Sequence, residues 1–316
     1  MAKGNLVLGT GRGSIGDVTL YRRNGQQVSR VRNRVVKNPK TDAQMIQRVI
    51  IATVAKAYSA MKSICDHSFQ GFSYGAQNMA RFESINANLL RNQLAMGELS
   101  DVPPYFSEKG AVGAVPNEWI ISDGTLTPIE VTPKEGMDSE SVSAFELVDL
   151  TGATGGATYQ NVADTLGVEI GDQLTLCVLF GNGSSTKFVY GRLILSSNDG
   201  DQAQSVVDDE YSNARNVNIG TAFTNSKLYI SIANVPNGYH PIAFGLIVSR
   251  KDGSGAWLRS KCKMTPLTID MSGMGAPMND ALASYNNEDL EGVYSPYYLN
   301  NANNVGGASE EDPSNP

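Results

Sequence analysis

Histidine and cysteine are scarce in this sequence. Its 316 residues include two histidines, His67 and His240, so catalytic or metal chemistry built on several imidazole groups is disfavoured from the start. The three cysteines, Cys65, Cys177 and Cys262, are odd in number and far apart, unlike the paired cysteines of a disulfide-stapled secreted domain. We therefore expect three reduced thiols in a protein core.

Long apolar runs are also lacking. The longest are well short of the roughly 20 residues that span a bilayer. The apolar run at residues 6–8 is too short for the central region of a signal peptide. We expect neither a membrane span nor a secretion signal. The chain is long enough to bury one large core or two ordinary ones without a metal or a disulfide.

The net charge of −7 conceals opposite charges in two parts of the chain. Residues 1–100 contain 14 Lys and Arg against 5 Asp and Glu, a net +9, whereas the other 216 residues contain 11 against 27, a net −16. Such an asymmetry indicates either an arm that binds nucleic acid or charge pairing between neighbouring copies.

The first forty residues are typical of a β arm. Segments 18–23 and 26–31 flank Asn24-Gly25, which is the strongest short signal for a two-residue type I′ hairpin, since both turn residues need positive φ. Counting outward from this turn predicts one face rich in arginine and an opposite apolar face that includes Val18 and Val31.

Basic residues are dense in and after this hairpin. At two-residue spacing along a strand they lie about 6.6–6.8 Å apart, which is close to the separation of successive phosphates. Three interpretations stay open: docking on the acidic domain of another copy, contact with nucleic acid, or a solvated face. The candidate contact residues are Arg22, Arg23, Arg30, Arg32, Arg34, Lys37 and Lys40.

Two helices are predicted after the arm. Asn38-Pro39 ends the extended segment, and Thr41-Asp-Ala-Gln44 fits a helix capping box. One apolar stripe at three- and four-residue spacing follows, and another runs over residues 76–96, so we expect an antiparallel helical hairpin. The first stripe consists of Ile46, Ile50, Val54, Ala57, Met61 and Ile64, and the second of Met79, Phe82, Ile85, Leu89 and Met96.

Short β-rich segments dominate the rest of the chain. Prolines and glycines make 101–116 a predicted linker. Strands without intervening helices are then typical of a sandwich or barrel; they are expected at 118–121, 125–131, 143–150, 173–180, 187–195, 227–233, 242–250 and 256–264. Residues from 268 onward are rich in Asn, Ser, Gly and acid and should not fold alone.

The expected fold class is therefore α+β, with an N-terminal β-hairpin arm and a helical hairpin followed by a mainly antiparallel β-sandwich or barrel domain and an extended tail. The predicted boundaries are 1–40 for the basic arm, 41–100 for the helical hairpin, 101–116 for the linker, 117–267 for the β domain and 268–316 for the acidic, Asn-rich tail.

Three motifs suggest chemistry, and each has a simpler interpretation. Gly11-Arg-Gly-Ser-Ile-Gly16 spells a dinucleotide fingerprint, but a hairpin follows where a helix is required, so flexible turns are favoured. Acidic residues at 198–201 and 208–210 do not have the spacing of a calcium-binding EF-hand, which favours a solvated loop. Cys65-Asp-His67 lacks both the further ligands of a zinc site and the orienting partner of a catalytic dyad. We expect no catalytic residue, no cofactor and no metal.

Several short motifs follow one another in the first part of the chain: Gly13-Ser-Ile-Gly16-Asp-Val, Tyr21-Arg-Arg-Asn-Gly25, Val28-Ser-Arg30, Asn38-Pro-Lys-Thr41-Asp-Ala-Gln44 and Gln47-Arg48, with Ile121-Ser-Asp-Gly-Thr-Leu126 further on. In this order they resemble an uncharacterised family of gut Bacteroides-type bacteria, their mobile elements and their phages. The resemblance covers about the first hundred residues and, loosely, 121–126. It implies a β arm, an Asn-Pro-x-Thr-x-x-Gln helix start and a β domain. Because similar helix starts occur in phage structural proteins, it also favours a role in a virion.

The preferred hypothesis is a self-assembling structural protein of a bacteriophage or phage-like particle, such as a capsid, tail or fibre component. Its partners would be copies of itself and, through the arm, nucleic acid, and it would be found in the virion or in the host cytoplasm before assembly. A soluble nucleic-acid-binding protein is the first alternative, and a carbohydrate-active or carbohydrate-binding β protein is the second. No enzyme activity is expected.

Overall fold

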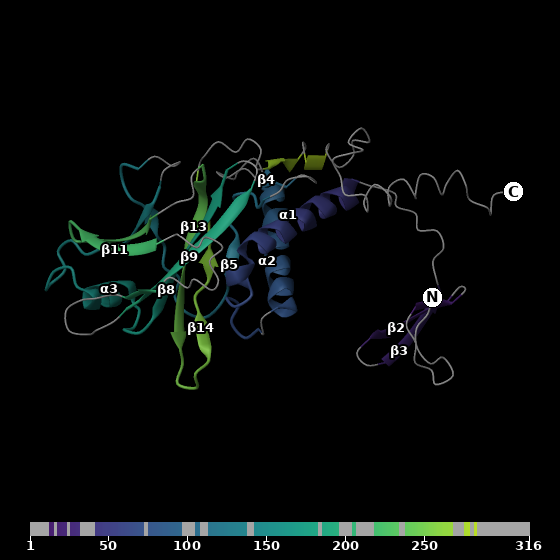
Figure 1. Ribbon diagram of the computed structural model, residues 1–316, viewed down its shortest axis with the longest axis horizontal. Helices are drawn as coiled ribbons and strands as arrows, with labels where there is room; N and C mark the ends of the chain where they lie inside the picture. The colour runs from purple at the N-terminus through teal and green to yellow at the C-terminus, as the bar shows by residue number, and fades with distance from the viewer. Residues whose placement is uncertain are drawn as a thin grey trace. The chain divides into compact units, whose positions relative to one another are not determined.

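The computed structural model divides into two compact units, residues 1–41 with 289–316 and residues 42–288, and each is described by itself. Figure 1 labels the main elements. The predicted α+β class with mainly antiparallel strands is confirmed. The structure describes residues 13–15, 18–23, 26–31, 42–72, 75–96, 105–107, 113–137, 142–182, 185–195, 204–206, 218–233, 238–267, 275–278 and 281–282.

The N-terminal unit contains a three-stranded antiparallel sheet in the order β1-β2-β3. β2 (Val18–Arg23) and β3 (Gln26–Val31) form the predicted hairpin in the predicted register, with Val18 opposite Val31. β1 (Gly13–Ile15) pairs with the free edge of β2. The expectation of turns across the glycine motif is therefore wrong for these three residues, because their backbone groups find partners on that edge.

The larger unit is organised around a six-stranded antiparallel sheet with the order β10-β9-β8-β13-β14, in which β16 also pairs with β13 (Figure 1). The side chains of β8 and β13 are buried along almost their whole length, since both faces of this sheet are covered. The strands are β8 (Gln173–Gly181), β9 (Thr186–Ile194), β10 (Gln204–Val206), β13 (His240–Lys251), β14 (Trp257–Arg259) and β16 (Thr265–Pro266).

A four-stranded sheet with the order β11-β12-β7-β6 covers one face of the central sheet. Its apolar residues share a core with alternate residues of β8 and β13, and the rings of Phe145 and Phe244 lie 4.8 Å apart across that core. The two sheets therefore form a sandwich. The strands are β6 (Thr132–Pro133), β7 (Ala144–Asp149), β11 (Asn218–Thr224) and β12 (Lys227–Ala233).

The two predicted helices, α1 (Asp42–Cys65) and α2 (Ala76–Ala95), cover the opposite face (Figure 1). Five of the six stripe residues predicted for α1 are buried, and Ile46 is half-buried against the same core. They pack on Cys177, Leu179, Phe188 and Tyr190 of the central sheet. The expected capping residue Thr41 lies outside the described residues. None of the helices in the described part of the chain is long and apolar enough to cross a membrane.

The buried face of α2 differs from the predicted one. Phe82 is buried as expected, but Met79 and Met96 are exposed, and the remaining places on the buried face include Asn78, Asn86 and Gln93. The predicted face is wrong because amide side chains are used to satisfy buried backbone groups rather than left in water. Periodicity of apolar residues alone does not reveal such a face.

These amides attach the helix to neighbouring segments. Asn86 donates from Nδ2 to the carbonyl of Ile120 (3.0 Å) and accepts at Oδ1 from the Ile120 amide (2.9 Å). Gln93 and Asn117 exchange two amide hydrogen bonds of 2.8 and 3.0 Å. The helix is thus held against β5 (Ile120–Ser122) by directional bonds as well as by apolar packing.

Segments predicted as linker and tail contribute to the folded unit. β4 (Tyr105–Phe106) pairs with β17 (Ala276–Pro277), and a side chain at Gly275 would come within 2.3 Å of Val115. The described residues 113–117 are all buried. The structure differs here from a linker-and-tail arrangement because both segments bring apolar residues to the core under the helices, where Phe106 and Ala281 are buried.

Several strands and one helix depart from the prediction. Residues 125–131 do not form a continuous strand, although Ile129 and Val131 are buried. α3 (Tyr159–Leu166) interrupts the strands where no helix was expected, with Thr158 as its N-cap and Gly167 in the left-handed conformation as its C-cap. The segment predicted at 256–264 divides into β14 and β15 (Cys262–Lys263), and β15 pairs with β5.

Replacing Asn86 by Ala should lower the free energy of unfolding by about 1–3 kcal/mol, because the half-buried amide and carbonyl of Ile120 lose these hydrogen bonds. Urea unfolding followed by circular dichroism measures this. Asn92→Ala, at an exposed site on the same helix, should change it by less than about 0.5 kcal/mol. Equal midpoints for the two variants would contradict this role of Asn86.

Candidate functional site

The structure describes only part of the predicted basic set. Arg30 is exposed on β3, and its guanidinium carbon lies 5.8 Å from the centroid of the Tyr21 ring. Arg22 and Arg23 belong to β2, but their side chains are not among those described. Arg32, Arg34, Lys37 and Lys40 lie outside the described residues, so the arginine stripe beyond Arg30 stays a prediction.

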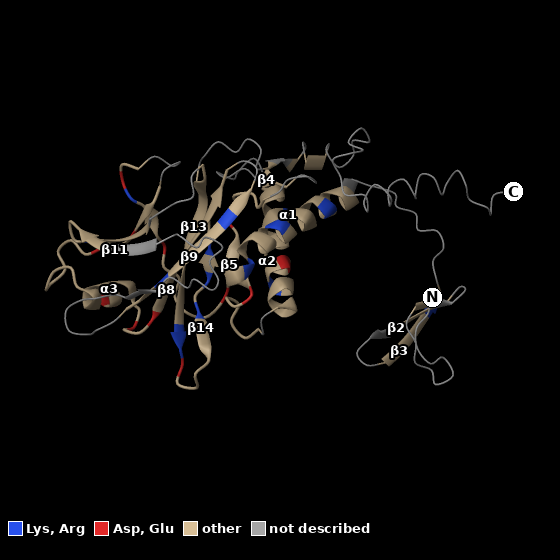
Figure 2. Cartoon of the chain, viewed as in Figure 1, with Lys and Arg blue, Asp and Glu red and all other residues tan. Residues whose placement is uncertain are grey.

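The charge asymmetry has a different distribution from the one expected. Within 42–282, the described residues include 14 Lys and Arg and 13 Asp and Glu, so the folded part is nearly neutral. The other 18 acidic residues after position 41 are in segments outside the described residues, and these include both acidic clusters at 198–201 and 208–210. Figure 2 shows basic residues along the two helices and at β14.

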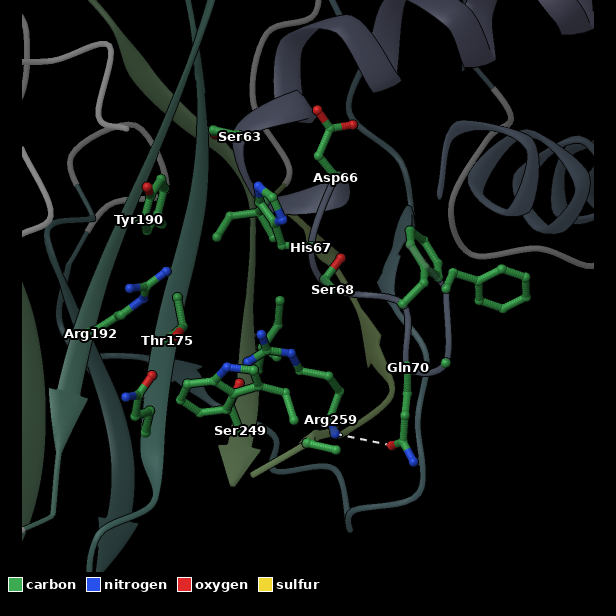
Figure 3. A pocket seen from close by; sticks show the side chains of 18 residues that line it. Ser63, Asp66, His67, Ser68, Gln70, Thr175, Tyr190, Arg192, Ser249 and Arg259 are labelled. Atoms are coloured by element: carbon green, nitrogen blue, oxygen red, sulfur yellow. Dashed lines mark hydrogen bonds between the residues drawn. The ribbon is translucent and has the colours of Figure 1, made fainter. Parts of the chain in front are cut away.

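A pocket of about 620 Å³ lies between the end of α1 with its following loop and the helix-facing side of the central sheet (Figure 3). Such a volume lies in the range of small-molecule sites. The loop contributes His67, Ser68 and Gln70, and β14 contributes Trp257 and Arg259. The strands β8, β9 and β13 supply the floor.

Strand register explains why the floor is polar. The side chains that face the helices form rows across the sheet, and the row with Cys177 and Tyr190 is buried in the helical core. The next row contains Arg192 opposite Thr175. The row after that runs from Gln173 through Ser249 to Arg259. These last two rows line the pocket, where the helices no longer cover the sheet.

Three separate segments fix the pocket's edge. Gln70 accepts at Oε1 from the backbone amides of Thr125 and Arg259, each at 3.1 Å, and Figure 3 marks the bond from Arg259. The Ser122 hydroxyl lies 2.9 Å from the Ser68 carbonyl and 2.7 Å from the Ser260 carbonyl. The 121–126 segment, which contributes to the sequence resemblance, thus joins the α1–α2 loop to the end of β14.

Gly124 permits the close approach of these segments. A Cβ atom at this position would lie 2.2 Å from the Arg259 carbonyl oxygen and 2.7 Å from Gln70 Oε1. Neither distance is compatible with a side chain. The neighbouring Asp123 forms an ion pair of 2.6 Å with Arg81 of α2, which adds a contact between the helix and the same segment.

Arg259 is the most perturbed cation of the pocket. Burial and the nearby charge of Arg192 lower the pKa of Arg259 to about 10. Its guanidinium carbon lies 4.8 Å from the centroid of the Trp257 ring, and Lys251 Nζ lies 5.1 Å from the same centroid. No ion pair of Arg259 with an acid occurs among the residues that the structure describes.

The Cys65-Asp-His67 motif does not have the features of a catalytic dyad. Cys65 is fully buried, and burial raises its pKa well above the ordinary value, whereas a nucleophilic thiol needs a lowered pKa. His67 is exposed at the pocket. Across the described residues, no group of three or more His, Cys, Asp or Glu is placed to hold a metal ion.

All three cysteines are buried free thiols in one core, as expected. Cys177 lies opposite Gly245 on the neighbouring strand, and a Cβ atom at Gly245 would lie 2.8 Å from Cys262 Sγ. Burial raises the pKa of Cys262 to about 12 and that of Cys177 well above its usual range.

Sequence reasoning considered the Cys65-Asp-His67 motif, of which Asp66 and His67 line the pocket, but it did not single out the pocket residues of the sheet. The usable signal was the alternation in β9, since Arg192 follows Phe188 and Tyr190 on one face of a strand with two apolar faces. A charged residue in that series indicates a place where the sheet is uncovered. Arg259 carried no comparable signal, because only the fold brings it to the same side of the sheet as Arg192.

Comparison with protein-family models, curated proteins and solved structures found no match to this chain.

Gly124→Ala should lower the free energy of unfolding by about 1–3 kcal/mol, since the added methyl group displaces the Arg259 backbone or the Gln70 side chain. Thermal or urea unfolding measures the loss. Gly253→Ala is the matched control, because no atom lies within 4 Å of its Cβ position and its φ is not positive. Equal stability of the two variants would show that the close approach does not constrain position 124.

The three thiols should react with a thiol reagent such as Ellman's reagent at pH 8 only after unfolding, because burial opposes formation of the thiolate. Absorbance of the released chromophore, followed with and without denaturant, counts the reactive thiols. Rapid modification of Cys65 in the folded protein, identified by peptide mass analysis, would instead restore the nucleophile interpretation.

Proposed function

We propose that this chain is a non-catalytic structural protein that assembles with copies of itself, with its N-terminal sheet as an assembly contact. The observation that carries the proposal is the exposure of that sheet. None of its described side chains is buried, and Val18 and Val31, which face each other across β2 and β3, are 41% and 76% exposed.

A small sheet of this kind needs a covering surface. Strands that bury few apolar groups gain too little free energy to offset the ordering of their chain. A neighbouring subunit supplies the missing surface only on assembly, so the cost of ordering is met when the contact forms. The cross-strand pair of Val18 and Val31 provides an apolar patch for such a contact.

Charge favours an acidic partner for the arm. Residues 1–41 contain 9 Lys and Arg and a single acid, Asp17, whereas the described part of 42–282 is nearly neutral. The acidic segments of neighbouring copies provide the opposite charge within the same molecule type. Complementary charges of this kind mainly accelerate encounter and fix register.

A bacteriophage or phage-like particle is the setting that the motif resemblance favours, with the chain as a capsid, tail or fibre component found in the virion or in the host cytoplasm before assembly. Nucleic-acid binding by the same arm is the second candidate. Arg30 above the Tyr21 ring favours it, because a cation beside an aromatic face suits single-stranded nucleic acid.

Val31→Asp should weaken self-assembly at least about tenfold, because a buried unpaired carboxylate would replace an apolar contact. Light scattering over a range of protein concentrations, at low and high salt, measures the assembly. The wild type should form objects larger than a monomer that shrink as salt screens the arm. The control is Ile51→Asp, at a 54% exposed position of α1, which should assemble like the wild type.

Two results would oppose the proposal: a strictly monomeric wild type at every salt concentration, or unchanged assembly of Val31→Asp. Titration of single-stranded and duplex DNA against the wild type and Arg30→Glu tests the second candidate. Equal DNA affinity of the two proteins would remove Arg30 from nucleic-acid contact. Electron microscopy of the untreated protein would show directly whether regular particles, tubes or fibres are present.

A further inference from the structure

We propose that the pocket between the α1–α2 loop and the central sheet binds an oxyanion, a phosphate or carboxylate group, between the guanidinium groups of Arg192 and Arg259. Both groups line the pocket, and Figure 3 shows that both point into it from different strands. This site is independent of the N-terminal arm.

The geometry suits a single ligand group between the two arginines. They stand on β9 and β14, with β8 and β13 between them, and Arg259 lies one row further along the sheet than Arg192. Three strand spacings of about 4.8 Å and a shift of two residues place their backbones about 16 Å apart. Two arginine side chains directed into that span leave room for one small group. Each guanidinium offers a planar fork of donors that matches the two oxygens of a carboxylate or a phosphate.

Among the described residues, the charge of Arg259 has no ion pair with an acid. Each guanidinium disfavours the other, and partial burial removes part of the water that would otherwise stabilise Arg259, as its lowered pKa indicates. The Trp257 ring supplies only a weak attraction, which is shared with Lys251. An anion beside Arg259 and within reach of Arg192 would offset the charge of Arg259 and accept hydrogen bonds from its fork of donors.

The charges of the residues that line the pocket favour an anion on the side of the pocket formed by the sheet. The described lining residues from the sheet include the cations Arg192 and Arg259 and no acid, and the nearby Arg250 is paired with Glu169 and Asp172. Asp66 is the one carboxylate among the described lining residues, and it accepts a hydrogen bond from Tyr58. In Figure 3, Asp66 lies at the helix end of the pocket and Arg259 at the opposite end.

The helix end is the less favourable place for an anion. α1 ends at this side of the pocket, and the last carbonyl groups of a helix carry partial negative charge. Together with Asp66 they would repel an oxyanion. The neutral donors near the two arginines are the hydroxyl groups of Thr175 and Ser249, which belong to the floor rows next to Arg192 and Arg259.

The test is a titration of the full chain with inorganic phosphate and, separately, with citrate, at constant ionic strength maintained with sodium chloride. Trp257 is 37% exposed beside Arg259, whereas Trp119, the other tryptophan, is fully buried. Tryptophan fluorescence therefore has a reporter in the pocket, and calorimetry gives an independent affinity. We expect saturable binding of at least one anion, and the tighter of the two identifies phosphate or carboxylate as the preferred group.

Arg259→Gln and Arg192→Gln should each weaken this binding at least about tenfold, because a charge-assisted pair of hydrogen bonds is lost. Arg259→Lys keeps the charge but not the fork and should fall between the wild type and Arg259→Gln. Arg91→Gln, at an exposed site on α2, is the matched control and should bind like the wild type. Circular dichroism and thermal unfolding verify that each variant is folded.

The inference is overturned if neither anion gives a saturable response with the wild type. It is equally overturned if folded Arg259→Gln and Arg192→Gln bind as tightly as the wild type, since binding would then occur elsewhere.

Discussion

The central sheet has apolar side chains on both faces, and the rest of the larger unit follows from the need to cover them. Alternate residues of β8 and β13 point to opposite sides, so two different surfaces must exclude water from one set of strands. The second sheet covers one side with a β-sandwich core, and the helical pair covers the other. Because the helices end before the strands do, the last rows on the helical side remain open as a pocket.

The helical layer is attached by more than apolar contact. α2 presents amides at Asn78, Asn86 and Gln93 to backbone and side-chain groups that would otherwise be buried without partners. Such bonds have direction, so they fix the position of the helix along the sheet as well as its contact with it. The 121–126 segment has a similar role at the other end, where Gly124 admits the backbone of Arg259. Asn78, which donates to the Asp66 carbonyl, and the 121–126 segment, which bonds to Gln70, both hold residues that line the pocket.

Local patterns predicted those parts of the fold that local rules determine. The hairpin around Asn24-Gly25, the stripe of α1 and the long strands β8, β9 and β13 follow from turn chemistry and periodicity, and all lie close to their predicted bounds. The buried face of α2 was not predicted, because an Asn or Gln side chain is expected to lie in solvent unless its distant hydrogen-bond partner is known. Likewise, β4 and β17 are each two residues long, and they are strands only because they pair with each other across about 170 positions of the chain. No local pattern predicts such a pairing.

The same limit explains why the pocket was not predicted. Arg192 and Arg259 are separated by 67 positions in the sequence and meet through four adjacent strands of one sheet. No spacing rule connects them. The arm, in contrast, could be predicted from the sequence, since its basic residues are close together in the chain. The surface that would cover the arm could not be predicted from any local pattern.

The contact between Gly245 and Cys262 has a consequence for how this sequence can diverge. The sulfur atom occupies the space that a methyl group at position 245 would need. A larger residue at 245 is compatible with the fold only where 262 has become smaller, and a chain that loses the thiol first leaves a void over β13. Substitutions at positions 245 and 262 should therefore occur together in sequences that descend from this one, although the two residues are 17 positions apart in the chain.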